Sequence, residues 1–187
     1  NELYASQWLD NIIEIAFEDT ENVLDAKATL TELIDNNPTI LNLQIKEAII
    51  DKFVDIMLKD KKGSQYTSII RATLVCDEAP ILTNQTLVAN RLLENRARLR
   101  SLLCDIAEGA NQQVVLTVQR EGGPVEINIS ELQFVTIEDS EDFYEYYVDL
   151  IQLMSELCLG RNYKSINLMR EQISLSLILK VVEQKDL

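Results

Sequence analysis

Apolar residues recur every three or four positions along most of this chain, which is the spacing that places them on one face of an α-helix. Pro38 and Pro80 interrupt the pattern, because proline cannot continue a helix. Gly160 stands where the longest late stripe stops, and glycine is common just after the end of a helix. The predicted helices cover approximately 3–18, 23–35, 43–59, 66–74, 84–93, 140–160, 163–172 and 174–182.

Residues 113–130 follow a different pattern, with apolar side chains at every second position on both sides of a turn. A period of two is typical of a β-strand, and the turn sequence Glu121-Gly122-Gly123-Pro124 between two such runs predicts a β-hairpin. The stretch 96–106 fits a helix or a strand equally well. We therefore expect one helical domain over 1–187, which carries the hairpin 113–130 as an insertion.

Successive helices with short connections favour an all-α fold, and specifically an armadillo/HEAT-like α-solenoid. The chain has only five Gly and three Pro in 187 residues, which agrees with long uninterrupted helices. The repeat has no strict period in the sequence, so an irregular all-helical bundle is the alternative.

The net charge of −14 and the hydrophobic content of 47% are typical of a folded, soluble domain. A strongly acidic surface repels phosphate groups and anionic lipid, so we expect no nucleic-acid partner and no direct membrane contact. The sequence has no apolar run of membrane-spanning length, and its first residues do not form a signal peptide. These features together predict a cytosolic location.

The chain contains no histidine, which removes the usual general base and the commonest zinc ligand. Cys76, Cys104 and Cys158 lie far apart in the sequence, and each stands beside aliphatic residues. This pattern predicts buried thiols rather than disulfides or metal ligands. We therefore predict no catalytic residue, no metal, no cofactor and no enzymatic activity.

Two clusters of charge could bind an ion or a partner. Acidic residues at 138–149 could supply calcium ligands, but the EF-hand pattern is absent and the helix dipole favours acids at a helix start in any case. Arginines at 91–100 could meet a phosphate or an acidic surface, but pairing within the chain is the simpler interpretation. The clusters consist of Glu138, Asp139, Glu141, Asp142, Glu145 and Asp149, and of Arg91, Arg96, Arg98 and Arg100.

The closing segment 140–187 carries the most specific sequence. It contains Tyr146-Tyr147, then Leu157-Cys158-Leu159-Gly160-Arg161-Asn162-Tyr163, then Ser165-Ile166-Asn167. In this order the residues closely resemble the RIH homology domain of inositol trisphosphate receptors, which ryanodine receptors share. Weaker similarity upstream covers Asn1–Ala5, the turn Pro80–Gln85 and the hairpin region, and the inositol trisphosphate branch is the closer of the two.

The resemblance implies a non-catalytic cytosolic regulatory module of an intracellular calcium-release channel, on the cytoplasmic face of the endoplasmic reticulum membrane. In that family the corresponding arm relays ligand-driven movement towards the pore of a homotetramer. The implied partners are neighbouring domains of the same receptor and adjacent subunits. The family's Tyr-Arg-Lys ligand motif lies just before the segment that matches Asn1, so we expect no ligand-binding residue here.

Two segments are our candidates for interdomain contacts, namely the joint between two late helices and the tip of the hairpin. The candidate residues are Gly160, Arg161, Asn162, Tyr163, Lys164, Glu121 and Pro124. One alternative is a helical-repeat adaptor or scaffold that binds protein partners and is unrelated to channels. A calcium sensor built on the acidic cluster is a second alternative.

Overall fold

The computed structural model describes residues 2–18, 25–43, 45–59, 64–93, 105–108, 114–120, 123–128, 143–173, 176 and 179. Most of these residues are helical. The helices are α1 (Glu2–Glu18), α2 (Ala26–Ile34), α3 (Pro38–Leu43), α4 (Glu47–Lys59), α5 (Ser64–Ala72), α6 (Leu82–Leu93), α8 (Phe143–Leu157) and α9 (Tyr163–Gln172), with a 3-10 turn η2 (Leu159–Arg161). The strands are β1 (Val75–Cys76), β2 (Ala79–Pro80), β3 (Asp105–Glu108), β4 (Val114–Arg120) and β5 (Gly123–Asn128).

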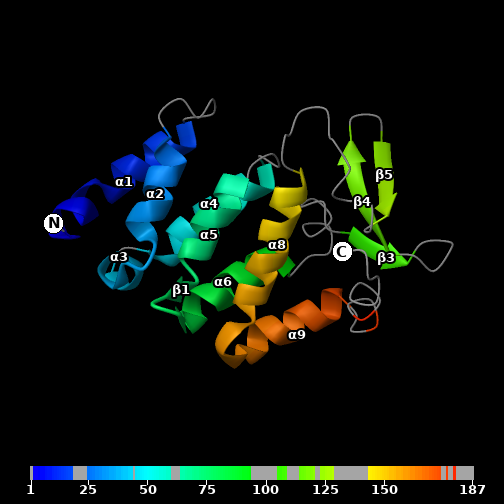
Figure 1. Cartoon of the computed structure of the whole chain (residues 1–187). Helices are drawn as coiled ribbons and strands as arrows, with labels where there is room; N and C mark the ends of the chain where they lie inside the picture. Colours follow the sequence, from blue (N-terminus) through cyan, green and yellow to red (C-terminus); the bar gives the residue numbers. More distant parts are fainter. Residues whose placement is uncertain are drawn as a thin grey trace.

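The helices pack one after another in two adjoining rows (Figure 1). One row contains α2, α5 and α8, and the other contains α4, α6 and α9, while α1 packs on α2 at the N-terminal end. Contacts of α4 with α5 and of α6 with α8 hold the rows together. The prediction of a mainly helical chain is confirmed, and the armadillo-type solenoid stays a prediction.

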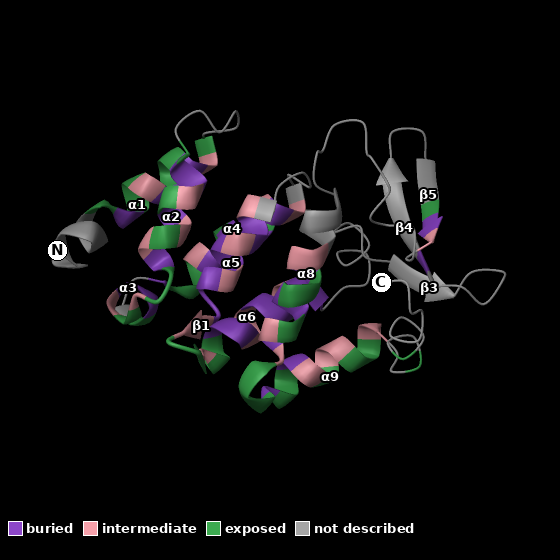
Figure 2. Ribbon diagram, in the orientation of Figure 1, coloured by how far each residue is buried: buried purple, intermediate pink, exposed green. Residues whose placement is uncertain are grey.

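A single hydrophobic cluster runs between the rows, where the buried faces of the helices meet (Figure 2). Its largest fully buried side chains include Leu30, Ile50, Ile69, Leu74 and Leu93. Complete burial of an aliphatic side chain of this size contributes about 1.5–3 kcal/mol. The apolar stripes in the sequence therefore mark the faces by which the helices pack.

The buried face of α8 agrees only in part with its apolar spacing. The spacing of Ile151, Met154 and Leu157 or Cys158 places them on one inner stripe with Phe143 and Tyr147, but the Ile151 side chain is 41% exposed. Met154 and Leu157 of this stripe are buried, and Leu150 and Leu153 beside it are completely buried. The buried face is wider than one stripe because α8 packs against both α5 and α6.

Pro38 begins a helix as well as ending one. The Asn37 side chain caps α3, since its Oδ1 accepts a hydrogen bond from the Ile40 N–H at 3.2 Å. Proline fits the first position of a helix, where its missing N–H would have no partner. Because the sequence analysis took Pro38 only as a stop, it missed α3 and started the next helix before Glu47.

A short hairpin of β1 and β2 was also missed. Cys76 pairs with Ala79, which leaves a two-residue loop of Asp77 and Glu78. Both loop residues have positive φ angles, of 48° and 62°, as a tight hairpin turn of the type I′ requires. Asn36 at the end of α2 accepts a hydrogen bond from the Asp77 N–H at 2.8 Å, so the turn is attached to α2.

The predicted β-hairpin is present as β4 and β5, which pair antiparallel with Leu116 opposite Ile127. A third strand, β3, extends it on the β4 side, so residues 105–106 of the ambiguous stretch are strand, and 96–104 lie outside the described residues. Ile127 is buried and belongs to the helical core, which anchors the sheet to the helices. That the sheet is an insertion within one domain stays a prediction.

Candidate contact sites at the helix joint and the adjoining groove

The joint between α8 and α9 lies on the segment that leads into α6. Gly160 has φ 68° and ψ 18°, the left-handed conformation that favours glycine. The helix α8 ends at Leu157 and Gly160 lies within η2, so the joint is longer than the single-residue stop that the sequence predicted. Gly160 faces the ring of Pro80 in β2.

Asn162 fixes the start of α9. Its Oδ1 accepts from the Ser165 N–H at 3.4 Å, which is the usual capping bond. Its Nδ2 lies 3.1 Å from Gln85 Oε1, 3.1 Å from Thr86 Oγ1 and 3.3 Å from the Leu82 carbonyl oxygen. Asn162 is only 6% exposed, so this candidate serves the interior of the joint rather than its outer surface.

Gln85 of α6 connects the two sides of the joint. Its Oε1 meets Asn162 at the start of α9, and its Nε2 donates to the Glu156 carbonyl oxygen of α8 at 2.8 Å. Gln85 is completely buried, and an unpaired amide in such a place would cost about 1–3 kcal/mol. The position of α9 relative to α8 is therefore fixed through α6.

The outer side of the joint combines cations with exposed apolar side chains. We call this the joint surface, and it consists of Leu82, Leu159, Arg161, Tyr163 and Lys164. Tyr163 is 67% exposed, Leu82 is 49% exposed and Leu159 is 43% exposed. Arg161 and Lys164 are exposed and have no ion-pair partner among the described residues.

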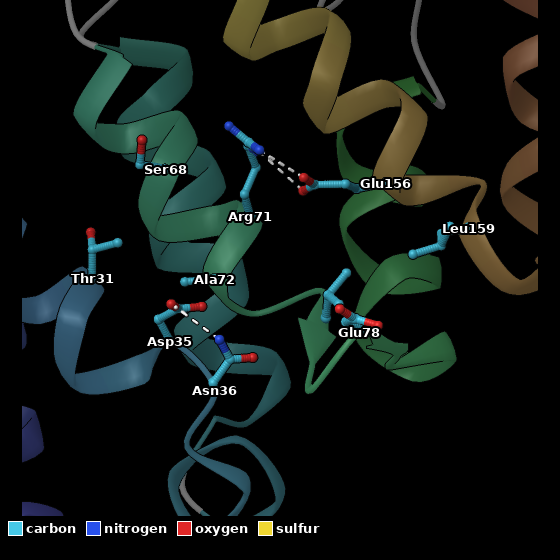
Figure 3. Close-up of a pocket in the computed structure, with 10 residues that line it drawn as sticks. Thr31, Asp35, Asn36, Ser68, Arg71, Ala72, Glu78, Glu156 and Leu159 are labelled. Carbon is cyan, nitrogen blue, oxygen red and sulfur yellow. Dashed lines mark hydrogen bonds and ion pairs between the residues drawn. The ribbon is translucent and has the colours of Figure 1, made fainter.

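A groove of about 620 Å³ opens beside the joint, between α2, α5, the β1–β2 turn and the end of α8 (Figure 3). The sequence alone does not indicate this groove, because its walls come from four segments that only the fold brings together. The lining residues are Thr31, Asp35, Asn36, Ser68, Arg71, Ala72, Val75, Glu78, Glu156 and Leu159.

Arg71 extends from α5 towards Glu156 of α8 (Figure 3) and also pairs with Asp149, so two carboxylates share it. Its Nη2 lies 2.8 Å from Glu156 Oε1, and its Nη1 lies 3.1 Å from Asp149 Oδ1. The hydrogen bond to Glu156 raises the pKa of Arg71 above its ordinary value. Burial raises the pKa of Asp149, against the opposing effect of Arg71, so one cation does not fully compensate two acids.

Comparison with known proteins assigns the chain to a family. The RIH domain family matches residues 1–103, which is more than half of the chain. The chain belongs to the RIH domain family. A curated relative, the inositol 1,4,5-trisphosphate receptor-like protein A of Dictyostelium discoideum, is 23% identical over 181 residues. The match covers 93% of this chain but only 5% of that relative, so the chain spans about one-twentieth of its length.

The family prediction made from the sequence is therefore confirmed, although the family match lies in a different part of the chain. The segment 140–187 suggested the family, whereas the match to the family covers α1 to α6 and ends at residue 103. The relative aligns along nearly the whole chain. Within the described ranges, none of the helices is both long enough and apolar enough to cross a membrane.

The remaining candidate residues of the chain are only partly described. Pro124 lies in β5 opposite Gln119, while Glu121 lies outside the described residues. Asp149 is the one member of the acidic cluster whose side chain is described, and it pairs with Arg71. Across the described parts of the chain, no group of three acidic or cysteine side chains could hold a metal ion.

Arg91 pairs within the chain, as the simpler interpretation of the arginine cluster predicted. Its Nε donates to Asp51 Oδ1 of α4 at 2.6 Å, which links α4 to α6. The other arginines of the cluster, at 96–100, lie outside the described residues.

The prediction of buried thiols is wrong for two cysteines of the chain. Cys76 and Cys158 are free and half-buried, because each lies at the end of an element rather than in its core face. Burial raises the pKa of both thiols, and the nearby carboxylates of Asp77 and Asp35 raise that of Cys76 further. Cys104 lies outside the described residues.

Proposed function

We propose that this RIH domain is a non-catalytic regulatory module of an inositol trisphosphate receptor-like calcium-release channel, and that it relays ligand-driven movement towards the pore. It would act on the cytoplasmic face of the endoplasmic reticulum membrane. Its partners would be neighbouring domains of the same receptor and adjacent subunits of a homotetramer. The family match and the similarity to an inositol 1,4,5-trisphosphate receptor-like protein support the proposal.

The buried hydrogen bonds at the joint are the main structural support for the proposed relay. Gln85 bonds to the end of α8 and to Asn162 at the start of α9, so a displacement of α8 moves α6 and α9 with it. The ion pairs of Arg71 with Asp149 and Glu156 link α5 to α8 in the same way. Stiff coupling between successive helices is what a rigid-body relay requires.

The joint surface is the candidate point of contact with the next domain. Tyrosine and arginine are enriched at the centres of protein interfaces, where they contribute much of the binding energy. Tyr163 and Arg161 are adjacent and exposed here. Gly160 and Asn162 would hold the bend that presents these side chains.

The test uses the full-length channel with the double change Arg161→Ser and Tyr163→Ser. We expect ligand binding to stay unchanged, because the joint surface holds no ligand residue. Ligand-evoked calcium release should fall about fivefold, which corresponds to the loss of about 1 kcal/mol of contact energy. Radioligand binding and calcium flux from microsomes measure the two quantities separately.

A matched control changes one cation and one exposed apolar residue away from the joint surface, with Ile15→Ser on α1 and Arg170→Ser on α9. Both residues are exposed, so the control should leave calcium release unchanged. Normal calcium release by the joint variant would contradict the contact at the joint surface. A loss of ligand binding equal to the loss of release would contradict a relay role.

A further inference from the structure

The groove beside the joint has more acidic groups than cations. Arg71 is the single cation among its lining residues, and Glu156 and Asp149 already share it. Asp35 and Glu78 stand at the exposed rim and make no ion pair in the described part of the chain. These four carboxylates and the one guanidinium together give a net charge of −3 around the groove.

The negative potential of this rim extends to a neighbouring group. Cys76 in β1 is half-buried, and its burial is the first reason why the pKa of its thiol is raised. The carboxylates of Asp77 and Asp35 raise the pKa further. Carboxylates at the end of α2 and in the β1–β2 turn therefore both contribute negative potential at the Cys76 thiol.

Part of the groove lining is apolar. It is formed by Ala72, Val75 and Leu159, and Leu159 is 43% exposed. A volume of about 620 Å³ lies within the range of small ligand sites and can hold a long side chain with its neighbours. An arginine side chain suits such a place, because its stem packs on apolar surface while its planar head binds carboxylates by two hydrogen bonds.

We propose that this groove is a docking site for an arginine-bearing polypeptide segment from outside residues 1–187. One guanidinium of the segment binds between the carboxylates of Asp35 and Glu78, and an adjacent apolar side chain packs on Leu159. Charge complementarity selects the occupant, since the groove has excess acid on its rim and an apolar wall to receive the stem. The docking site shares Leu159 with the joint surface, but the proposal does not depend on the channel function.

The test measures binding of a fluorescein-labelled peptide, acetyl-Ala-Arg-Ala-Leu-Arg-Ala-amide, to the 187-residue chain by fluorescence anisotropy. At about 0.15 M salt, charges beyond about 8 Å are largely screened, so general attraction to an acidic protein is reduced. The same peptide with glutamine in place of arginine is the ligand control. We expect saturable binding of the arginine peptide and none of the glutamine peptide.

Two threonines of α2 provide matched variants. Thr31 lines the groove, whereas Thr29 is exposed outside it, and each hydroxyl donates to the carbonyl oxygen four residues earlier. Thr31→Arg places a cation in the groove and should weaken peptide binding about tenfold or more, by competition and repulsion. Thr29→Arg adds the same charge to the same helix and should leave binding unchanged.

A second pair of variants removes charge instead of adding it. Asp35→Asn with Glu78→Gln should weaken binding about threefold or more, while Asp10→Asn with Glu14→Gln on α1 removes the same charge elsewhere and should not. Equal weakening by both members of either pair would overturn the proposal in favour of unspecific attraction. Equal binding of the glutamine peptide, or no binding of the arginine peptide, would also overturn it.

Discussion

A Cβ atom placed on Gly160 would lie only 2.3 Å from the Cγ atom of Pro80. Carbon atoms that are not bonded do not approach so closely, and the proline ring cannot turn aside as a flexible chain would. Gly160 also has a φ angle of 68°, which other residues adopt only with strain. The joint between α8 and α9 therefore depends on glycine for its bend and for its contact with β2.

Replacement of Gly160 by alanine should lower the free energy of unfolding by about 2–5 kcal/mol, from about 1–2 kcal/mol of backbone strain and about 1–3 kcal/mol of overpacking. Chemical denaturation followed by circular dichroism measures the change. The double variant Pro80→Ala and Gly160→Ala should regain the stability lost to overpacking, while the loss from backbone strain remains. A double variant without any recovery would show that the close approach to Pro80 is unimportant.

Asn162 should tolerate neither alanine nor aspartate. Alanine removes the cap of α9 and the hydrogen-bond donor to α6, which should lower the free energy of unfolding by about 1–3 kcal/mol. Aspartate keeps the capping oxygen but directs a second oxygen at acceptors of Leu82, Gln85 and Thr86, so it should cost at least as much. Thermal denaturation tests both variants, with Asn167→Ala on the exposed side of α9 as a control within about 0.5 kcal/mol. An aspartate variant as stable as the wild type would show that the Asn162 Nδ2 donor does not contribute to stability.

The sequence predicted the elements whose signals are local. The apolar spacing located α1, α4 and α9, and the bounds of α9 agree with the prediction because the bend at Gly160 and Asn162 precedes it directly. The hairpin of β4 and β5 followed from its alternation and its glycine-rich turn. In each case neighbouring residues alone determine the backbone conformation.

The elements that were missed depend on contacts between distant segments. Asp77 and Glu78 form a two-residue turn without the usual glycine or asparagine, and the bond from Asp77 to Asn36 supports it. The groove brings together residues as far apart in the sequence as Thr31 and Leu159, and a hydrogen bond to α6 joins Asn162 to Leu82, 80 positions earlier. One sequence without an alignment contains no signal for such pairs.

Replacement of Asp149 by asparagine should alter the pH dependence of stability. The folded protein raises the pKa of Asp149, so the folded state holds this proton more tightly and gains stability from it at low pH. That gain is complete below the ordinary pKa of about 4 and is lost as pH rises through the folded value. Asparagine resembles the protonated acid at every pH.

We therefore expect the stability of the asparagine variant relative to wild type to increase as pH rises from about 4 to about 7. Urea denaturation at several pH values measures the difference, and Asp10→Asn on the exposed face of α1 supplies the baseline. A difference that falls with rising pH would mean that Arg71 outweighs burial at this carboxylate.

The reactivity of Cys76 should report the acidic rim of the groove. The double variant Asp35→Asn and Asp77→Asn removes two charges that raise its pKa, so the thiolate fraction at neutral pH should increase. Alkylation of Cys76 by iodoacetamide should accelerate about twofold at low salt and less at high salt. Peptide mass spectrometry quantifies each cysteine, and Cys158, whose pKa is raised by burial alone, is the internal control. Equal acceleration at both thiols would indicate loosening of the fold instead.

The amide of Gln85 has a consequence for the mechanics of the chain. Because one planar group bonds to the last turn of α8 through its nitrogen and to the first turn of α9 through its oxygen, neither helix can rotate about the bend without breaking one bond or turning the amide. The bend at Gly160 is thus a rigid bend and not a hinge. A change in the angle between α8 and α9 would require the hydrogen bonds of α6 to both helices to break first. The helix α6, which precedes the joint in the sequence, therefore controls whether the joint can move.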